Sequence, residues 1–216
     1  MSEVVIEMPK EAIEILSRDP VMKGLIDRFG AQTIRKRGQP FAELVRSIIS
    51  QQLSTKAAAK IWERVKNLLS DVNPKNILEA RENDLRRAGL SASKVKYVKA
   101  LAEAAFSGEI DFAIIDTLDD SEIIEKLTKI KGIGEWTAQM FLMFCLGRED
   151  VFPVGDLVIQ KAMMRIYGYA VTRPGIGHIV RLDPASRFLR FEALDIAENW
   201  RPYRTYASIY LWRSMG

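Results

Sequence analysis

The sequence predicts an all-α protein made of two helical lobes, and three observations support this prediction. Apolar residues recur at the i, i+3, i+4, i+7 spacing of amphipathic helices along most of the chain. These segments alternate with short turns that carry helix caps, glycine or proline. No segment shows a convincing strand pattern of alternating apolar and polar residues. We therefore expect about ten helices of modest length, with short connections.

Breaks in the helical pattern divide the chain into the two lobes. The central lobe is assigned to residues 36–150, between a break around 32–38 and a second break around 147–156. Residues 1–35 and 151–216 together form the second lobe, so both ends of the chain contribute to it.

The first clear helix is followed by a tight corner at residues 51–53. The apolar stripe of this helix consists of Phe41, Leu44, Val45, Ile48 and Ile49. Ser54 is an N-cap residue for the next helix, because its side-chain oxygen can accept from a free backbone N–H group. The expected buried face of that second helix consists of Ile61, Val65, Leu68 and Leu69.

Cap and stop signals bound the next helices. Asn73 followed by Pro74 predicts a helix start, and Gly89 predicts the end of a short helix. Ser93 is expected to cap a further helix that ends before Gly108. Polar positions in this region are Arg86, Lys94 and Lys96. We interpret them as ordinary solvated charges, and contact with phosphate groups is the alternative.

Further helices are expected in the second half of the chain. One begins at Ser121, after an acidic stretch, and another runs from residue 135 to about 146. Asp156 occupies the N-cap position of the next helix. The remaining expectations are a loop at Gly175-Ile176-Gly177 with His178, a helix start at Asp183-Pro184 and a terminal helix over residues 202–212.

The strongest local motif is a helix, a glycine turn and a second helix at residues 127–138. Gly132 and Gly134 let the backbone approach a ligand closely, and the free N–H groups that open the second helix form an anion site. Such a turn is suited to a DNA phosphate and does not read the base sequence. The alternative is a helix corner that needs glycine only for its backbone angles.

Composition excludes several classes of protein. The single cysteine, Cys145, excludes an internal disulfide, a thiolate zinc site and a four-cysteine iron–sulfur cluster. The single histidine, His178, argues against multi-histidine metal sites and most Ser-His-Asp mechanisms, so we expect carboxylates to carry catalysis. A net charge of +4 is compatible with a polyanionic partner. Because no apolar run approaches the roughly 20 residues of a membrane span, we expect no membrane partner and a cytoplasmic, nucleoid-associated or nuclear location.

Three motifs in order resemble the helix-hairpin-helix superfamily of base-excision DNA glycosylases, most closely its 3-methyladenine branch. They are the hairpin at 127–138, the Val-Phe-Pro-Val-Gly-Asp-Leu segment at 151–157 and the aromatic motif at 200–213. The resemblance spans roughly residues 41–212. It implies a DNA-binding cleft between the lobes and, as partner, double-stranded DNA that contains a damaged base. We expect the protein to act as a monomer.

The resemblance also implies roles for matching residues. Asp156 would be the catalytic carboxylate, although an aspartate before an amphipathic helix is also a common cap. Lys131, Gly132 and Gly134 would hold the DNA backbone. The family often has proline at the position of Lys131, so this lysine either adds a phosphate contact or is simply tolerated.

The resemblance further implies a bound Na+ or K+ ion and no other cofactor. The ion would be held by the main-chain carbonyls of Thr128, Ile130 and Ile133. Branches that also cut the DNA backbone have a lysine nucleophile at the position of Trp136, so no Schiff base can form there and no lyase activity is expected. The missing cysteine cluster separately removes the iron–sulfur branches.

A pocket for the base can be predicted from the aromatic residues. An alkylated purine is positively charged, so the indole face of Trp136 can stack on it with a cation–π gain of about 0.5–2 kcal/mol. Met140, one turn later, and Tyr203, Trp200 and Trp212 are weighed as further pocket residues. Core packing is the alternative for all five side chains, and of the three terminal aromatics only Tyr203 and Trp200 are assigned to the pocket.

The corner at residues 51–53 is the predicted wedge that fills the space left when a nucleotide is rotated out of the duplex. In the resembling family this loop has that role, and Gln52 with Leu53 beside it are the expected wedge residues. The alternative is that Gln52 caps a helix end and Leu53 packs against Ala58.

These observations lead to one main hypothesis and two alternatives. The main hypothesis is a monofunctional DNA glycosylase that flips out an alkylated purine, such as 3-methyladenine, and hydrolyses its N-glycosidic bond. The first alternative is a glycosylase for oxidised, deaminated or mismatched bases. The second is a non-catalytic DNA-binding module, for which residue 156 would be irrelevant and binding would weaken with salt.

Overall fold

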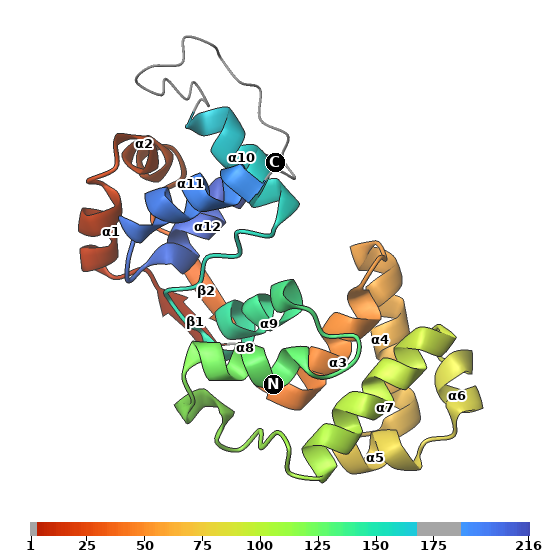
Figure 1. Ribbon diagram of the computed structural model, residues 1–216. Helices are drawn as coiled ribbons and strands as arrows, with labels where there is room; N and C mark the ends of the chain where they lie inside the picture. The colour runs from red at the N-terminus through yellow and green to blue at the C-terminus, as the bar shows by residue number, and fades with distance from the viewer. Residues whose placement is uncertain (1–3, 168–186) are drawn as a thin grey trace. The chain divides into compact units, whose positions relative to one another are not determined.

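The computed structural model describes residues 4–167 and 187–216, which are drawn in colour in Figure 1. These residues contain twelve α-helices and two short strands, so the predicted all-α class is confirmed. They divide into two units: unit 1 comprises residues 37–146, and unit 2 comprises the described residues of 4–36 and 147–216. The predicted lobes, 36–150 and 1–35 with 151–216, have boundaries within a few residues of these units.

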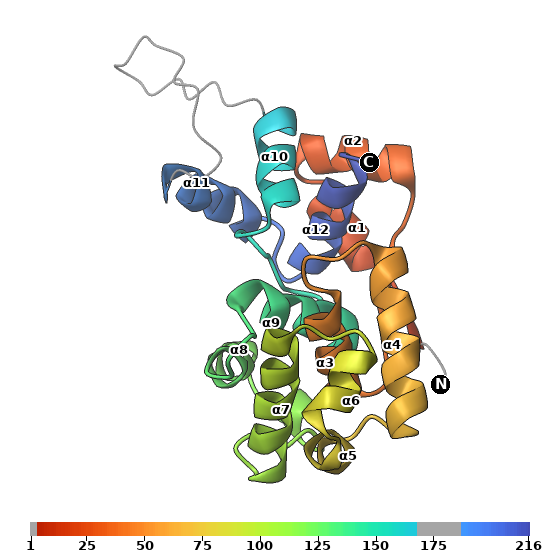
Figure 2. The same cartoon turned by 90° about the vertical axis from the view of Figure 1, so that its right-hand side faces the viewer.

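Unit 1 is a continuous stretch of chain folded around the long helix α7. Its elements are α3 (Pro40–Ser50), α4 (Thr55–Leu69), α5 (Pro74–Glu79), α6 (Glu82–Arg87), α7 (Ala92–Phe106), the 3₁₀ turn η1 (Ile115–Thr117), α8 (Asp120–Thr128), α9 (Glu135–Phe141) and the π-helical turn η2 (Leu142–Leu146). Helix α7 contacts α3, α5 and α6, as Figure 2 shows.

Side-chain caps define the starts of several helices in unit 1. Ser54 accepts from the Ala57 N–H at 3.3 Å to begin α4, and Asn73 accepts from the Asn76 N–H at 2.8 Å to begin α5. These two predicted caps are confirmed. The prediction for α7 is wrong by two residues, because Ser91 and not Ser93 accepts from the Lys94 N–H, at 3.2 Å.

The buried face of α4 differs from the predicted stripe at two positions, because Ile61 is only half-buried and Leu68 faces solvent. Val65 and Leu69 are buried as expected, but Leu68 is 42% exposed. Trp62 takes its place in the core and is 9% exposed. Trp62 and Leu68 both lie within one residue of the helical spacing set by the buried residues of α4. The packing of neighbouring helices therefore decides that Trp62, and not Leu68, points inward.

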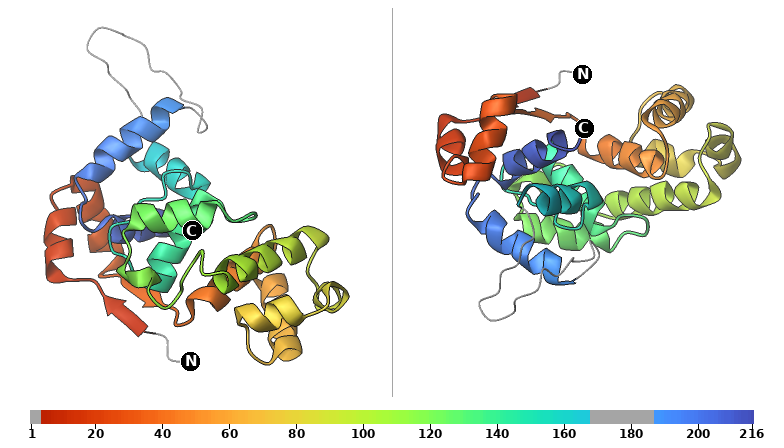
Figure 3. Two further views of the ribbon diagram at one scale, coloured as in Figure 1. Left: turned by 60° about the horizontal axis from the view of Figure 1, so that its bottom comes forward. Right: turned by 90° about the horizontal axis from the view of Figure 1, so that it is seen from above.

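Unit 2 combines elements from both ends of the chain. They are β1 (Val4–Glu7), α1 (Lys10–Leu16), α2 (Pro20–Phe29), β2 (Thr33–Lys36), α10 (Leu157–Ile166), α11 (Arg187–Glu198) and α12 (Arg204–Arg213). Helix α12 packs against α2 and α10, so the red N-terminal helices lie beside a blue C-terminal one in Figure 3. The terminal helix begins at Arg204, two residues later than predicted.

Strands β1 and β2 contradict the expectation that no strand forms. They pair antiparallel in the register Val4↔Lys36, Val5↔Arg35, Ile6↔Ile34 and Glu7↔Thr33. Each strand has four residues, and β1 exposes Val4 and Val5, so its sequence lacks the alternation that marks a half-buried strand. Ile34 is fully buried and fixes the ribbon to the core of unit 2.

Aromatic residues fill the core of unit 2. Trp200, Tyr206 and Tyr210 are fully buried. The Asp19 carboxylate accepts from the indole N–H of Trp200 at 3.0 Å and from the hydroxyl of Tyr167 at 2.7 Å. Burial, together with this carboxylate, raises the pKa of the Tyr167 hydroxyl.

Some predictions fall on residues that the structure does not describe. The Gly175-Ile176-Gly177 loop, His178 and the helix start at Asp183-Pro184 lie outside the described residues. Within the described residues, no helix combines the length and the apolar character needed to cross a membrane.

Candidate functional site

The glycine hairpin lies between α8 and α9, as predicted. The Ile130 N–H donates to the carbonyl of Leu127 at the end of α8, and the Ile133 N–H donates to the carbonyl of Ile130, both at 3.1 Å. Ile130 and Ile133 are buried, which anchors the turn on both sides of Gly132. Backbone hydrogen bonds and buried side chains therefore fix the conformation of the hairpin within unit 1.

Gly132 adopts a backbone conformation that a side chain would disrupt. Its φ angle is +97°, in the region that favours glycine. A Cβ atom placed on it would lie 2.3 Å from the Cγ atom of Tyr97 on α7. The carbonyl of Gly132 accepts from the Gln51 side-chain amide at 2.9 Å. The first predicted glycine is thus required for packing against α7, which supports the alternative that it shapes a helix corner.

The other predicted residues of the hairpin face solvent. Lys131 and Gly134 are exposed, and Gly134 is the N-cap residue of α9 without a side-chain cap. The first N–H groups of a helix have no intrahelical acceptor, so this end of α9 can accept an anion. Trp136, at the second position of α9, is 46% exposed and is not a core residue.

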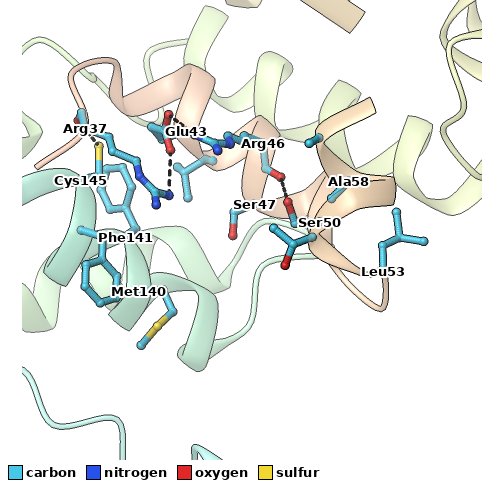
Figure 4. A pocket seen from close by; sticks show the side chains of 14 residues that line it. Arg37, Glu43, Arg46, Ser47, Ser50, Leu53, Ala58, Met140, Phe141 and Cys145 are labelled. Carbon is cyan, nitrogen blue, oxygen red and sulfur yellow. Dashed lines mark hydrogen bonds and ion pairs between the residues drawn. The ribbon is translucent and has the colours of Figure 1, made fainter. Parts of the chain in front are cut away.

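A hollow of about 320 Å³ lies beside this helix within unit 1, as Figure 4 shows. Met140 and Phe144 line one side, and they follow Trp136 at intervals of four residues along α9 and η2. Ser47 and Ser50 of α3 line the opposite side, and Leu53 lies at one end. The predicted pocket residue Met140 and the predicted wedge residue Leu53 therefore border the same hollow.

Charged residues border another part of the hollow. Glu43 pairs with Arg46 at 3.5 Å and with Arg37 at 3.7 Å. The buried Cys145 thiol donates to the main-chain carbonyl of Arg37 at 3.4 Å. The hollow thus has an apolar side at Met140 and an ion-paired side at Glu43.

The corner at residues 51–53 projects from unit 1 as a tight turn. Gln52 has a φ of +57° and is exposed, and Leu53 is 40% exposed. Among the described residues, the Gln52 side chain makes no hydrogen bond, so the alternative that it caps a helix end finds no support. The corner presents one polar and one apolar side chain to solvent.

Asp156 begins α10, at the end of a turn closed by a 2.8 Å bond from its N–H to the carbonyl of Pro153. Its Oδ1 atom accepts from the N–H groups of Val158 at 2.8 Å and Ile159 at 3.0 Å. The predicted N-cap is therefore confirmed. The same oxygen also accepts from the indole N–H of Trp212 at 3.1 Å, so a second helix holds the half-buried carboxylate.

The segment that leads to Asp156 is pinned to the start of α12. Arg204 donates to both carboxylate oxygens of Asp150, at 2.6 and 3.0 Å. Thr205 donates to the carbonyl of Arg148 at 2.7 Å and accepts from the Val151 N–H at 3.0 Å. Arg204 and Thr205, at the start of α12, thus fix the backbone that precedes Asp156. Trp212, near the end of the same helix, contacts the carboxylate itself.

The structure corrects the aromatic side chains predicted for unit 2. Trp200 is fully buried and bonded to Asp19, and Tyr203 is 8% exposed with its hydroxyl donating to Glu11 at 3.1 Å. Both are core residues, so the core-packing alternative holds for them and the predicted role in a base pocket is wrong. Trp212, which the sequence placed on equal terms with Trp200 and Tyr203 but which was not assigned to the pocket, is the indole that reaches Asp156. The sequence alone does not separate Trp212 from Trp200, because both lie in the same aromatic-rich terminal segment.

The carbonyls of Thr128, Ile130 and Ile133 lie in and next to the hairpin turn. Neutral carbonyl oxygens are ligands that hard cations accept, so the chemistry of this donor set fits an alkali ion. The Ile130 carbonyl already accepts one N–H group but retains a second lone pair. Among the described residues, no group of three or more histidine, cysteine, aspartate or glutamate side chains is arranged to hold a metal ion.

Comparison with known proteins gives matches along the whole chain. Residues 45–174 match the model of the HhH-GPD superfamily base excision DNA repair protein. The chain is 34% identical over 219 residues to DNA-3-methyladenine glycosylase 1 of Schizosaccharomyces pombe, covering 98% of this chain and 90% of that relative.

Two solved structures resemble the fold closely. A DNA-3-methyladenine glycosidase from Bacillus halodurans matches with a TM-score of 0.81 and 34% identity, covering 99% of this chain and 93% of the other. The Schizosaccharomyces pombe 3-methyladenine DNA glycosylase bound to abasic DNA matches with a TM-score of 0.76 and 32% identity, covering 95% of this chain and 96% of the other.

Proposed function

The chain belongs to the HhH-GPD superfamily of base excision DNA repair proteins, and we propose that it is a monofunctional DNA glycosylase for alkylated purines such as 3-methyladenine. Its relatives named DNA-3-methyladenine glycosylase match it over nearly its full length, which supports glycosylase activity in base excision repair. The observation that carries the assignment of its chemistry is the half-buried Asp156 carboxylate, held by three donors.

The proposed reaction breaks the bond between the anomeric carbon and the base nitrogen. The bonding electron pair leaves with the cationic base, which departs neutral, so little acid assistance is needed. Water adds to the anomeric carbon and releases a proton. Asp156 stabilises the positive charge that develops on the sugar, directs the water, or does both. The three fixed donors hold this carboxylate in place before the substrate binds.

Unit 1 is proposed to supply the DNA grip and part of the base site. The exposed start of α9, with Gly134 and Lys131, binds a backbone phosphate without reading sequence. The main-chain carbonyls of Thr128, Ile130 and Ile133 would hold an alkali ion, which would supply positive charge for DNA binding. The exposed Trp136 face stacks on the cationic base. Because Trp136 carries no amine, we propose that the enzyme lacks lyase activity.

The corner is proposed to act as the wedge. Rotating a nucleotide out of the duplex costs a few kcal/mol, and the vacated space must be filled. Gln52 and Leu53 are exposed at the tip of a tight turn, which supports their insertion into the base stack. Leu53 also lines the hollow with Met140, so the wedge and the base site are neighbours in unit 1.

Release of free base from methylated DNA by the variant Asp156→Asn tests the proposal. Asparagine caps helices about as well as aspartate, so the fold should persist while the charge is lost. We expect base release to fall at least 100-fold, about 3 kcal/mol of transition-state stabilisation, with DNA binding retained. Near-normal turnover by this variant would refute the catalytic assignment. A wild-type protein that binds DNA but releases no base would indicate a non-catalytic module.

Substrate range is measured in the same assay. Duplexes carrying 3-methyladenine, hypoxanthine, ethenoadenine or 8-oxoguanine are compared at equal enzyme concentration. We expect the cationic methylated purine to be released fastest, because stacking on Trp136 favours positive charge. A preference for 8-oxoguanine or hypoxanthine would instead assign the enzyme to oxidised or deaminated bases.

A further inference from the structure

The corner at residues 51–53 has a backbone that needs support from elsewhere. Gln52 has a φ of +57°, a conformation that residues other than glycine seldom adopt. Such a residue persists where the surrounding structure holds it. The corner also follows the last turn of α3, whose final carbonyl groups have no partner within the helix. The described hydrogen bonds identify the group that supplies this support.

Lys94 reaches the corner from the first turn of α7. Its ammonium donates to the carbonyl of Ile49 at 2.7 Å and to the carbonyl of Gln51 at 2.7 Å. One acceptor belongs to the last turn of α3 and the other to the corner itself. A cation at the C-terminal end of a helix is also favoured by the helix dipole. The side chain is partly buried, and this burial lowers the pKa of the ammonium. Lys94 is therefore not the ordinary solvated charge that the sequence suggested.

The same turns of α7 also support the glycine hairpin. Tyr97, three residues after Lys94, packs against Gly132 so closely that no Cβ atom fits between them. Gln51, whose carbonyl accepts from Lys94, donates its side-chain amide to the carbonyl of Gly132 at 2.9 Å. One end of α7 thus holds the corner and the hairpin in a fixed relation within unit 1.

We propose that Lys94 is a positioning residue for base flipping, which holds the corner so that Gln52 and Leu53 can enter the base stack. This inference rests on the proposed function, because it requires the corner to be the wedge. Lys94 acts through the Ile49 and Gln51 carbonyls and does not touch DNA. Its loss leaves the hairpin grip in place, so flipping is lost while general DNA binding is kept.

Helix α7 provides a matched control in Lys99. Its ammonium donates to the carbonyls of Leu78 at 2.8 Å and Ala80 at 2.7 Å, at the end of α5. The chemistry is the same as at Lys94, two carbonyl acceptors at a helix C-terminus, but the supported segment has no proposed contact with DNA. The variants Lys94→Met and Lys99→Met therefore remove equivalent bonds, and only the first removes support from the corner.

The experiment measures flipping, binding and chemistry separately in the full chain. Flipping is followed by the fluorescence of 2-aminopurine placed next to an abasic-site analogue, binding by anisotropy with undamaged duplex, and chemistry by single-turnover release of 3-methyladenine. For Lys94→Met we expect at least a tenfold fall in the flipping signal and in base release, with affinity for undamaged DNA within twofold of wild type. Lys99→Met should change none of the three, and Lys94→Arg should restore flipping because it keeps a charged donor.

A further variant separates failure of this inference from failure of the proposed function. If the double variant Gln52→Ala with Leu53→Ala leaves flipping unchanged, the corner is not the wedge, and the proposed role of the corner falls together with the inference. If this double variant lowers flipping and Lys94→Met does not, the wedge stands and the role of Lys94 is refuted. An equal loss in Lys94→Met and Lys99→Met also refutes it, since the effect is then general to α7. Where Lys94→Met does not stay folded, Lys94→Gln is measured by the same criteria.

Discussion

Gly132→Ala is expected to destabilise the protein, because two independent features of the structure exclude a side chain there. The φ angle of +97° strains any residue with a Cβ atom, at about 1–2 kcal/mol. The new Cβ atom would lie 2.3, 2.5 and 2.7 Å from the Cγ, Cδ2 and Cβ atoms of Tyr97. Overpacking of this kind costs about 1–3 kcal/mol. We therefore expect the free energy of unfolding to fall by about 2–5 kcal/mol, which is a large share of the stability of a typical domain.

Gly134→Ala is the matched control in the same turn. The φ angle of Gly134 is −97°, and no atom lies within 4 Å of a Cβ atom built on it. Its free energy of unfolding should remain within about 1 kcal/mol of wild type. Its DNA affinity should fall nevertheless, because a methyl group at the start of α9 obstructs the approach of a phosphate.

Urea unfolding and fluorescence anisotropy with duplex DNA measure the two quantities on one preparation. An unfolding free energy of Gly132→Ala within about 0.5 kcal/mol of wild type would refute the packing argument. The double variant Tyr97→Ala with Gly132→Ala adds a check, because removal of the ring should recover part of the loss. Recovery should be incomplete, since the Cβ atom of residue 97 remains 2.7 Å away. Strict additivity of the two single changes would show that the contact carries no energy.

Two further predictions concern single side chains, one in each unit. Trp212→Phe removes the indole donor to Asp156 and keeps an aromatic ring, so single-turnover base release should fall about tenfold, in line with a hydrogen bond to a charged group. An unchanged release rate would show that α12 does not position the carboxylate. Lys131→Ala should lower the slope of log affinity against log salt by about one unit and leave thermal unfolding unchanged. A slope equal to that of wild type would exclude a phosphate contact at this lysine.

Local signals predicted the secondary structure where the relevant chemistry is itself local. Ser54, Asn73 and Asp156 each cap a helix as expected, because a cap involves a side chain and N–H groups two or three residues away. Ser91 and Ser93 lie two residues apart with the same side chain, so the pattern alone favoured the wrong one. The β1–β2 ribbon was missed because its pairing joins residues about 30 positions apart in two very short strands.

The candidate site depended on longer-range packing and was predicted less completely. The glycine turn and Asp156 were found from motif and spacing, and the exposure of Trp136 and Gln52 agrees with a site at the surface. Which indole reaches Asp156 is decided by α12 packing on α10, and that information is not contained in any short window of sequence. Lys94 was read as a solvated charge for the same reason, since its acceptors lie 43 and 45 residues away along the chain.

The split construction of unit 2 has a consequence for the order in which the protein forms during synthesis. Residues 4–36 leave the ribosome first, but the Asp19 carboxylate can accept hydrogen bonds from Trp200 and Tyr167 only after all of unit 1 has been synthesised. Unit 1 is contiguous, so its helices can pack as soon as residue 146 has emerged. The N-terminal helices of the nascent chain therefore lack their packing partners while unit 1 folds. Unit 2 can complete its core only after the last helix has been synthesised.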